Sequence, residues 1–286
     1  MMQDVILDTF IDGIKLLPFL FLTYLVMEYV EHKTSGKTGK MMQKSGKWGP
    51  VLGGALGIVP QCGFSTAASN LYAGGIITPG TLFAVFLSTS DEMLPIFISE
   101  QVPLSTIVRI LAVKAAIGIA AGFLMDGVIR RKKGESGEKL KIDHLCEHQH
   151  CHCQEGNILK SAFNHTLQIF LFVLLITFFM NLLIGRIGEE TLAAFVSGKL
   201  FLGPLLSGLV GLIPNCASSV VLTQLYLEGV LGAGSMLAGL LAGSGVGLLV
   251  LYKVNDNLQE NIKITLALYM TGVLSGILIE MTGLAF

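Results

Sequence analysis

Long apolar stretches constrain this chain more than any other feature of its sequence. Six of them are about as long as an α-helix must be to cross the ~30 Å hydrocarbon core of a bilayer, at roughly 9–30, 76–99, 105–129, 163–184, 230–252 and 261–282. Only 14% of the residues are charged, against about a quarter in a soluble domain. We therefore predict an all-α polytopic membrane protein. The net charge of −1 gives no reason to expect a nucleic-acid partner.

Two further apolar stretches, roughly 50–72 and 203–226, are interrupted near their middles. The interruptions read Pro60-Gln61-Cys62-Gly63 and Pro214-Asn215-Cys216-Ala217. Proline removes a backbone donor and breaks a helix, and the freed backbone groups cannot be left facing lipid. Each break must therefore be buried in protein or line a wet cavity.

The two interruptions belong to an internal repeat. A shift of 154 residues places Pro60 on Pro214, and it also aligns Cys62 with Cys216 and Ser65 with Ser219. Chance similarity among apolar helices explains matching leucines, but not this combination in one register. We predict a first repeat at 1–129, a loop at 130–160 and a second repeat at 161–286.

The basic residues suggest how the repeats are oriented. Lysines and arginines are frequent at 33–47 and at 130–141, and such loops favour the cytoplasm. Both loops stay inside only if 50–72 is a re-entrant hairpin rather than a full crossing. Each half then has three spanning helices plus one broken hairpin, and the second half is inverted. That plan is typical of secondary transporters with a midplane site.

Side chains able to bind a substrate gather at the two hairpin tips. They are Gln61, Cys62, Ser65, Asn215, Cys216, Ser218 and Ser219. A broken helix exposes carbonyl oxygens at one half-helix end and N–H donors at the other, so a tip can coordinate a cation or cradle an anion. Thiolates favour soft metals, and carboxamides favour harder ions such as Mn²⁺. The simpler alternative is that the cysteines are small buried residues and the amides only satisfy the breaks.

An acidic pair, Asp91 and Glu92, lies inside the apolar stretch 76–99. A carboxylate at mid-bilayer costs roughly 2.5–3.5 kcal/mol and marks a pathway or proton relay by default. We predict that the pair binds the metal or carries a counter-transported proton, unless the span ends early and the pair is interfacial. Asp12 and His165, on the first span of each half, are further coupling candidates, with interfacial positions as the alternative. Lys114, Asp126 and Glu280 are assigned to span ends or local pairs.

The central loop is rich in histidine and cysteine. Its candidate ligands are His144, Cys146, His148, His150, Cys151, His152 and Cys153. These side chains bind Zn²⁺ and Cu⁺, although no C-x₂-C pair of a zinc finger is present. We predict a flexible cytoplasmic segment that collects or senses metal, with a linker of drifted composition as the alternative.

The paired P-[QN]-C motifs, the repeat and the His/Cys loop resemble the ten-span heavy-metal exporter family. That family is related in name to the organoarsenical permeases, and its members are often assigned as manganese transporters. The resemblance covers nearly the whole chain, and it implies metal or metalloid transport, with efflux as the expected direction. The family motif falls on Pro60-Gln61-Cys62 and Pro214-Asn215-Cys216.

These features favour a proton-coupled secondary transporter of the inner (plasma) membrane that exports a transition-metal or metalloid ion. The alternative is a transporter of a small organic or inorganic anion, bound by half-helix N-termini and tip serines. No Walker A motif occurs, so we expect that ATP is not the energy source within this chain. We expect that the protein is not an enzyme. We also expect that it requires no cofactor, because the metal ion is its substrate. The expected partners are lipid, the ion and, as an open alternative, further copies of the chain.

Overall fold

The computed structural model describes residues 48–59, 62–90, 93–133 and 202–283, with separate positions between 14 and 25 and between 163 and 179. For Cys62 and Cys216 it describes the backbone only. Several predictions lie outside the described residues: the spans 9–30 and 163–184, Gln61, Asp91, Glu92, Asp12, His165 and the His/Cys residues of the central loop.

All regular secondary structure in the described residues is helical. The helices of the first half are α3 (Gly49–Gly57), α4 (Cys62–Ala73), α5 (Pro79–Ser88), α6 (Met93–Ser99) and α7 (Leu104–Lys133). Those of the second half are α11 (Leu202–Gly211), α12 (Cys216–Leu227), α13 (Ala233–Ala242), α14 (Val246–Val254) and α15 (Leu258–Thr282). The predicted all-α class is therefore confirmed for this part of the chain.

Four helical segments are long and apolar enough to cross a membrane: Pro79–Ser99, Leu104–Ile129, Ala233–Val254 and Leu258–Thr282. They confirm the spans predicted at 76–99, 105–129, 230–252 and 261–282. The 25 residues of α15 extend about 38 Å at about 1.5 Å per residue, which exceeds the ~30 Å hydrocarbon core. The protein is therefore a multi-pass membrane protein.

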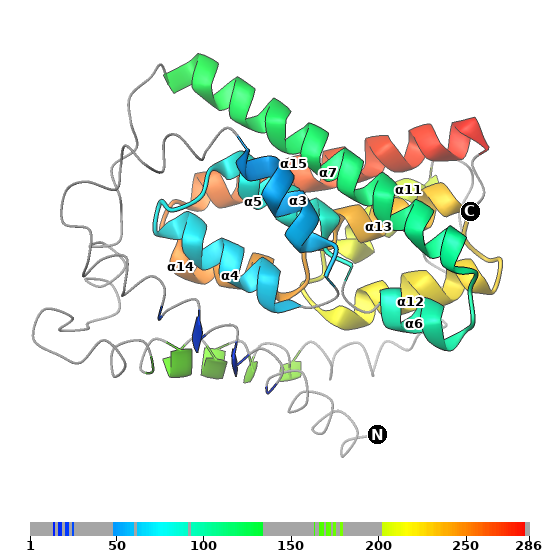
Figure 1. Ribbon diagram of the computed structural model, residues 1–286, viewed down its shortest axis with the longest axis horizontal. Coiled ribbons are helices and arrows are strands. Elements are labelled where there is room, and N and C mark those ends of the chain that lie inside the picture. Colours follow the sequence, from blue (N-terminus) through cyan, green and yellow to red (C-terminus); the bar gives the residue numbers. More distant parts are fainter. Residues whose placement is uncertain are drawn as a thin grey trace, which may run out of the picture.

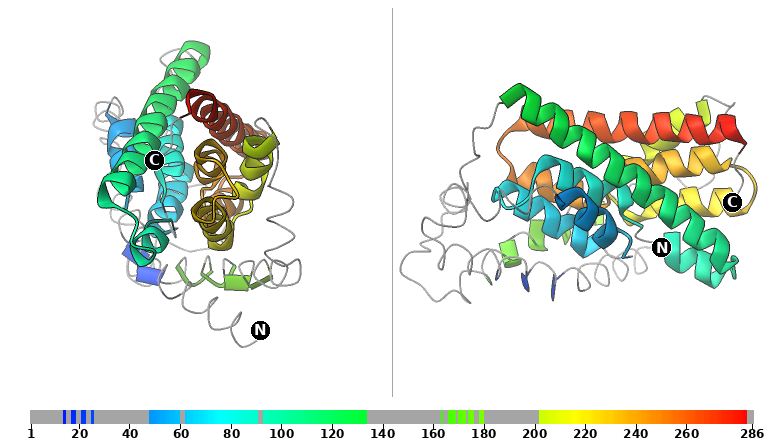
Figure 2. Two further views of the ribbon diagram at one scale, coloured as in Figure 1. Left: turned by 90° about the vertical axis from the view of Figure 1, so that its right-hand side faces the viewer. Right: turned by 45° about the horizontal axis from the view of Figure 1, so that its top comes forward.

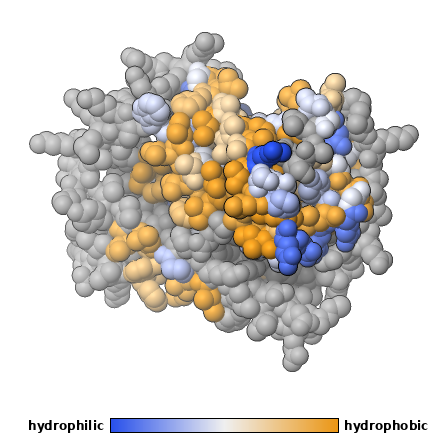
Figure 3. Space-filling view, turned by 45° about the vertical axis from the view of Figure 1, so that its right-hand side comes forward, coloured by the Kyte–Doolittle hydropathy of each residue, from blue (hydrophilic) through white to orange (hydrophobic). Residues whose placement is uncertain are grey.

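Helices α7 and α15 form the outer layer of the described bundle. Only 33% of each apolar window is buried, against 75% and 89% for the two other spans. The exposed side of α15 carries Ile262, Leu266, Met270, Leu274 and Leu278, one apolar stripe along the helix. A stripe this long suits lipid rather than water, and Figure 3 shows a broad apolar area of the same kind on one side of the molecule.

The two outer helices run along the long axis of the molecule in opposite directions (Figures 1 and 2). Helices α4 and α14 pack together at one end, and α6 and α12 pack together at the other (Figure 1). Each of these contacts joins one helix of the first half to one helix of the second. The two halves are therefore packed against each other at both ends of the bundle.

The bounds of the helices follow the shift of 154 residues that aligns the sequence. Helix α4 begins at Cys62 and α12 at Cys216, and α7 begins at Leu104 and α15 at Leu258. The turn before α5 and the turn before α13 each contain a glycine in the left-handed region. Gly75 has φ 73° and Gly229 has φ 74°, a conformation that costs glycine little.

The second span of each half differs from its prediction, because the helix is broken in the middle. In the first half, α5 ends at Ser88 and α6 begins at Met93; in the second, α13 ends at Ala242 and α14 begins at Val246. Thr89 and Ser90 follow α5, and Gly243, Ser244 and Gly245 separate α13 from α14. Short hydroxyl residues and glycines tolerate non-helical backbone. Apolar residues on either side hide such a break from a hydropathy average.

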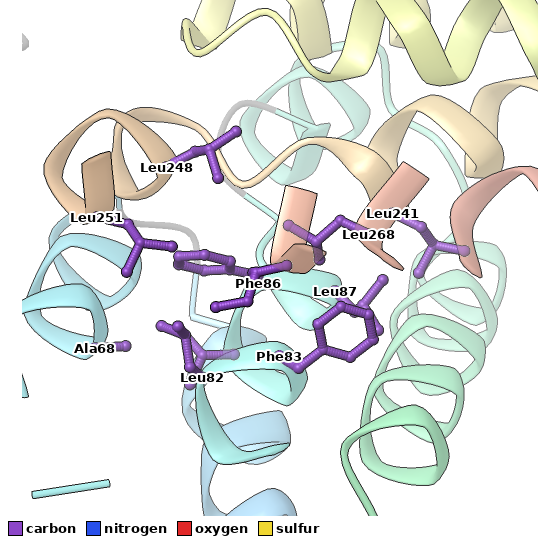
Figure 4. Packing of buried hydrophobic residues seen from close by; sticks show 11 residues of the cluster. Ala68, Leu82, Phe83, Phe86, Leu87, Leu241, Leu248, Leu251 and Leu268 are labelled. Atoms are coloured by element: carbon purple, nitrogen blue, oxygen red, sulfur yellow. The ribbon is translucent and has the colours of Figure 1, made fainter. Parts of the chain in front are cut away.

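A buried apolar cluster joins the two halves. Figure 4 shows Leu82 and Phe86 of α5 facing Leu251 of α14 and Leu268 of α15. Lipid is as apolar as these side chains, so close packing rather than removal from water stabilises such contacts. This cluster holds α5 and its break in a fixed position beside the second half.

Glycines allow each broken span to touch its outer helix. A Cβ atom added to Gly80 would overlap the carbonyl oxygen of Gly122, and one added to Gly234 would overlap that of Gly276. Close approach of membrane helices through small residues is a general packing mode. The same contact therefore joins α5 to α7 and α13 to α15.

Acidic residues near the ends of the outer helices bind the starts of the inner ones; for Asp126 and Glu280 the position near a span end was predicted, but these partners were not. Asp126 accepts hydrogen bonds from the Gly80 amide and the Thr78 hydroxyl, both at 2.8 Å. Glu280 accepts one from the Ser235 amide at 3.2 Å. Negative charge at a helix N-terminus is stabilising, so these two carboxylates have a structural role.

Candidate translocation site

Three interruptions of the helices meet at one small pocket. The residues that line it come from the α5–α6 break, the second hairpin tip, and the end of α13 with the α13–α14 break: Thr89, Ser90, Asn215, Ser218, Ser219, Gly239, Leu240, Gly243 and Gly245. The space in which the centre of a water molecule can lie is about 10 Å³, roughly what one water molecule needs. The pocket therefore suits a water molecule or a small ion in this conformation.

The second interruption, predicted from the sequence to be a hairpin tip, is organised around Asn215. This residue precedes α12 with extended backbone, φ −148° and ψ 149°, and its side chain accepts from the Ala217 amide at 3.5 Å. The Ser218 hydroxyl donates to the carbonyl oxygen of Asn215 at 2.8 Å. Asparagine is among the preferred residues at a helix N-cap, so the tip both starts α12 and lines the pocket.

The start of α4, which follows the first predicted tip in sequence, reaches the same region through α14. Ser65, in the first turn of α4, is fully buried, and a Cβ atom on Gly247 would lie 2.7 Å from the Ser65 Cβ. The Ser69 hydroxyl donates to the Gly247 carbonyl oxygen at 2.7 Å. The start of α4 thus lies directly against the start of α14, next to Gly245 in the pocket wall.

The α13–α14 break contains a buried hydroxyl that lacks a hydrogen-bond partner within the described structure. Ser244 is 2% exposed, and its Oγ atom has no acceptor or donor in reach. Its neighbours Gly243 and Gly245 both line the pocket. Gly245 has φ 54° and ψ −141°, a backbone conformation that favours glycine. An unsatisfied buried hydroxyl beside a pocket fits a position where a ligand or water binds.

A buried lysine lies behind the pocket wall. Lys114 of α7 is 0% exposed, and its ammonium donates to the carbonyl oxygens of Thr89 and Leu240, at 3.1 Å for the latter. Both acceptors belong to residues that line the pocket. Ten residues separate Lys114 from the start of α7 at Leu104, which is about 15 Å along the helix. Of the two alternatives predicted for Lys114, the position near a span end is therefore wrong, and the side chain instead pairs with carbonyl groups of two neighbouring helices.

The described residues hold no group of three or more His, Cys, Asp and Glu side chains that could bind a metal. The pocket wall instead offers hydroxyls, one carboxamide and backbone groups. These are hard oxygen and nitrogen donors. A soft metal site within this pocket would require the thiols of Cys62 or Cys216.

Of the residues predicted at the tips, the structure brings Asn215, Ser218 and Ser219 into one pocket and puts Ser65 against Gly247, two residues after Gly245 of the pocket wall. Sequence analysis did not identify Thr89 and Ser90, the break at Ser244, or Lys114. Each had a signal in the sequence. Ser88-Thr89-Ser90 and Gly243-Ser244-Gly245 are runs of residues that favour breaks, and Lys114 is a charge near the centre of an apolar span.

Broken helices around a polar pocket inside a multi-pass bundle define the class of membrane transport proteins. A family model described as "Putative, 10TM heavy-metal exporter" matches residues 1–188, and the chain belongs to that family. No curated protein matches the chain, and no solved structure does.

Proposed function

We propose that the protein is a secondary transporter that exports a metal or metalloid species through the pocket at the helix breaks. The observation that carries this proposal is the meeting of three interruptions, from both halves, at one buried polar pocket. Membrane proteins leave backbone unpaired at mid-bilayer only where it lines a cavity or is buried in protein. Family membership supports heavy-metal export as the direction and cargo.

The two halves, 1–129 and 161–286, are proposed to be an inverted repeat. The coincident helix bounds, the reciprocal α4–α14 and α12–α6 contacts and the opposite directions of α7 and α15 (Figure 1) support this arrangement. The first hairpin then enters from the cytoplasmic side and the second from outside. The central loop 130–160 is cytoplasmic in this proposal, because its basic residues favour that side.

Residues outside the described part complete the proposed mechanism. Gln61 and the thiols of Cys62 and Cys216 add ligands at the two tips. Asp91 and Glu92 follow the pocket residue Ser90 directly in sequence, which suits a role in binding the cargo or carrying a coupled proton. Asp12 and His165 are the further proposed proton sites, and the His/Cys loop is a proposed metal collector.

Export of an anion is a second candidate, favoured by the positive ends of the helices at the pocket. Helices α12 and α14 both begin there, after Asn215 and Gly245, and helix N-termini attract anions. The ammonium of Lys114 lies behind the same wall. None of the described lining residues carries a carboxylate. A metalloid oxyanion satisfies both this electrostatic pattern and the family assignment.

Uptake into inverted membrane vesicles distinguishes the candidates. Vesicles with and without the protein are incubated with external Mn²⁺, Zn²⁺, arsenite or arsenate, and accumulation inside them is measured with and without an imposed proton gradient. Metal or arsenite accumulation that depends on the protein and on the gradient supports the first candidate. Accumulation of arsenate alone supports the second.

A double substitution tests the thiols as ligands. We expect Cys62→Ala with Cys216→Ala to abolish accumulation of a thiol-binding probe while the protein still reaches the membrane. Cys146→Ala in the central loop is the matched control, because it removes one thiol far from the tips in sequence. Unchanged uptake by the double variant means that the thiols are not essential ligands.

A further inference from the structure

The ammonium of Lys114 joins the two halves of the protein behind the pocket. Its helix, α7, belongs to the first half, as does its acceptor Thr89, whereas its acceptor Leu240 lies in α13 of the second half. Both acceptors are backbone carbonyl oxygens. The side chain therefore bridges the two broken spans at the level of their breaks.

These two carbonyl groups belong to helix ends. Thr89 is the C-cap of α5, and Leu240 lies within the last four residues of α13, whose carbonyl groups have no acceptor role inside an α-helix. The C-terminus of a helix carries partial negative charge and favours a cation. In transporters with broken helices, such carbonyl oxygens are where coupling cations bind.

We propose that Lys114 is a resident cation, tethered to α7, that fills a cation site formed by the C-terminal ends of α5 and α13. The position that matches Lys114 under the repeat is Leu268 of α15, which is fully buried in the apolar cluster. The repeat therefore contains the charge once, in the first half. A free Na⁺ or K⁺ does not bind between Thr89 and Leu240 while the lysine occupies that position.

The alternative role is packing, in which the long side chain fills space and its charge is incidental. The two roles predict different effects for two substitutions of Lys114. Lys114→Ala removes both the charge and the bulk, which leaves the carbonyl oxygens facing a space. Lys114→Met removes the charge but keeps most of the bulk. A resident cation is replaced by a small free cation only in the first case.

The test is the melting temperature of purified protein in detergent during titration with methylammonium, with choline as a cation too large for the site. We expect Lys114→Ala to melt below wild type and to regain about 3–6 °C at ten times the dissociation constant of methylammonium. Wild type and Lys114→Met should show no such gain. Lys263→Ala, which removes an exposed lysine of the equivalent helix α15, is the matched control.

Any one of three results overturns the proposal. Lys114→Met has the same melting temperature as wild type, or methylammonium raises the melting temperature of Lys114→Ala no more than that of wild type. In the third, choline raises the melting temperature of Lys114→Ala as much as methylammonium does. If Lys114→Ala is recovered only when methylammonium is present throughout purification, the resident-cation role is supported. If neither variant is recovered even then, the side chain acts through more than its charge and the proposal fails.

The role of this resident cation in transport rests on the proposed function, but the melting test of the cation site needs no transported cargo. Vesicle uptake with Mn²⁺ and arsenite adds a separate readout, in which methylammonium restores uptake by Lys114→Ala. If wild-type vesicles carry none of the probes but the melting test succeeds, the proposed function fails and the resident cation stands. If wild-type vesicles take up a probe but the melting test fails, the proposed function stands and the resident cation fails.

Discussion

Substitution of Gly247 tests whether the first hairpin tip is seated on the α13–α14 break. An alanine Cβ there would lie 2.7 Å from the Ser65 Cβ and 2.8 Å from the Ser65 carbonyl carbon. Carbon atoms in contact lie about 3.5–4.0 Å apart, so α4 and α14 must separate by about 1 Å. One of the atoms that blocks the Cβ is backbone, so a rotamer change does not relieve the overlap.

The expected cost follows from these contacts. Overpacking of this kind costs about 1–3 kcal/mol. Separation also weakens the bond from the Ser69 hydroxyl to the Gly247 carbonyl oxygen, but Ser69 keeps a second acceptor in Ser65 at 3.0 Å, so this loss is at most about 1 kcal/mol. The total is about 1–4 kcal/mol, which lowers the melting temperature by about 2–16 °C in a chain of this size.

The assay is thermal unfolding of purified Gly247→Ala in detergent, together with vesicle uptake of the probe that wild type carries. Gly127→Ala is the matched control, since a Cβ on Gly127 of α7 meets nothing within 4 Å, and removal of a helical glycine gains about 0.5–1 kcal/mol. We expect Gly247→Ala to melt well below this control and to lose uptake. If both variants melt together and both retain uptake, the tip is not held where the structure places it.

Three further outcomes are expected. Gly80→Ala and Gly234→Ala should lower the melting temperature by similar amounts, because each meets the equivalent carbonyl oxygen of its outer helix; a large loss in only one would contradict equivalent packing in the halves. Ser218→Ala should reduce uptake at least tenfold if its hydroxyl contacts cargo with about 1.4 kcal/mol, and it should lower the melting temperature by about 1–6 °C because the hydrogen bond to the Asn215 carbonyl oxygen is lost. Deletion of residues 143–153 should leave vesicle uptake intact, whereas complete loss would point to metal hand-off by the loop.

Sequence patterns predicted the spans well because length and apolarity decide them. The spans in α7 and α15 are at least 25 residues long, with mean hydropathies of 2.0 and 1.8, and such stretches are typical of membrane-spanning helices. The second tip was also predictable, since a proline within an apolar run must break the helix, and Asn215 is a residue type that begins a new one.

The break after Ser90 was not predicted, because Asp91 and Glu92 were interpreted as functional charges within one span. The break at Ser244 was not predicted, because a few small residues hardly change the hydropathy of a span. Burial by the surrounding helices makes such a break tolerable, and that burial is a property of the tertiary structure. Lys114 illustrates the same limit. A lysine within a span suggests a site, but its two carbonyl acceptors lie 25 and 126 residues away in the chain.

The central claim is that cargo binds in the pocket between the α5–α6 break, the second tip and the α13–α14 break. Vesicle uptake by Ser219→Leu tests it most directly, because a leucine at this pocket-lining position fills a space of about one water molecule. Ser99→Leu, at an exposed position at the end of α6, is the matched control. The account predicts that Ser219→Leu reaches the membrane but loses uptake while Ser99→Leu retains it. Uptake by Ser219→Leu at the rate of its control would contradict the assignment of the pocket.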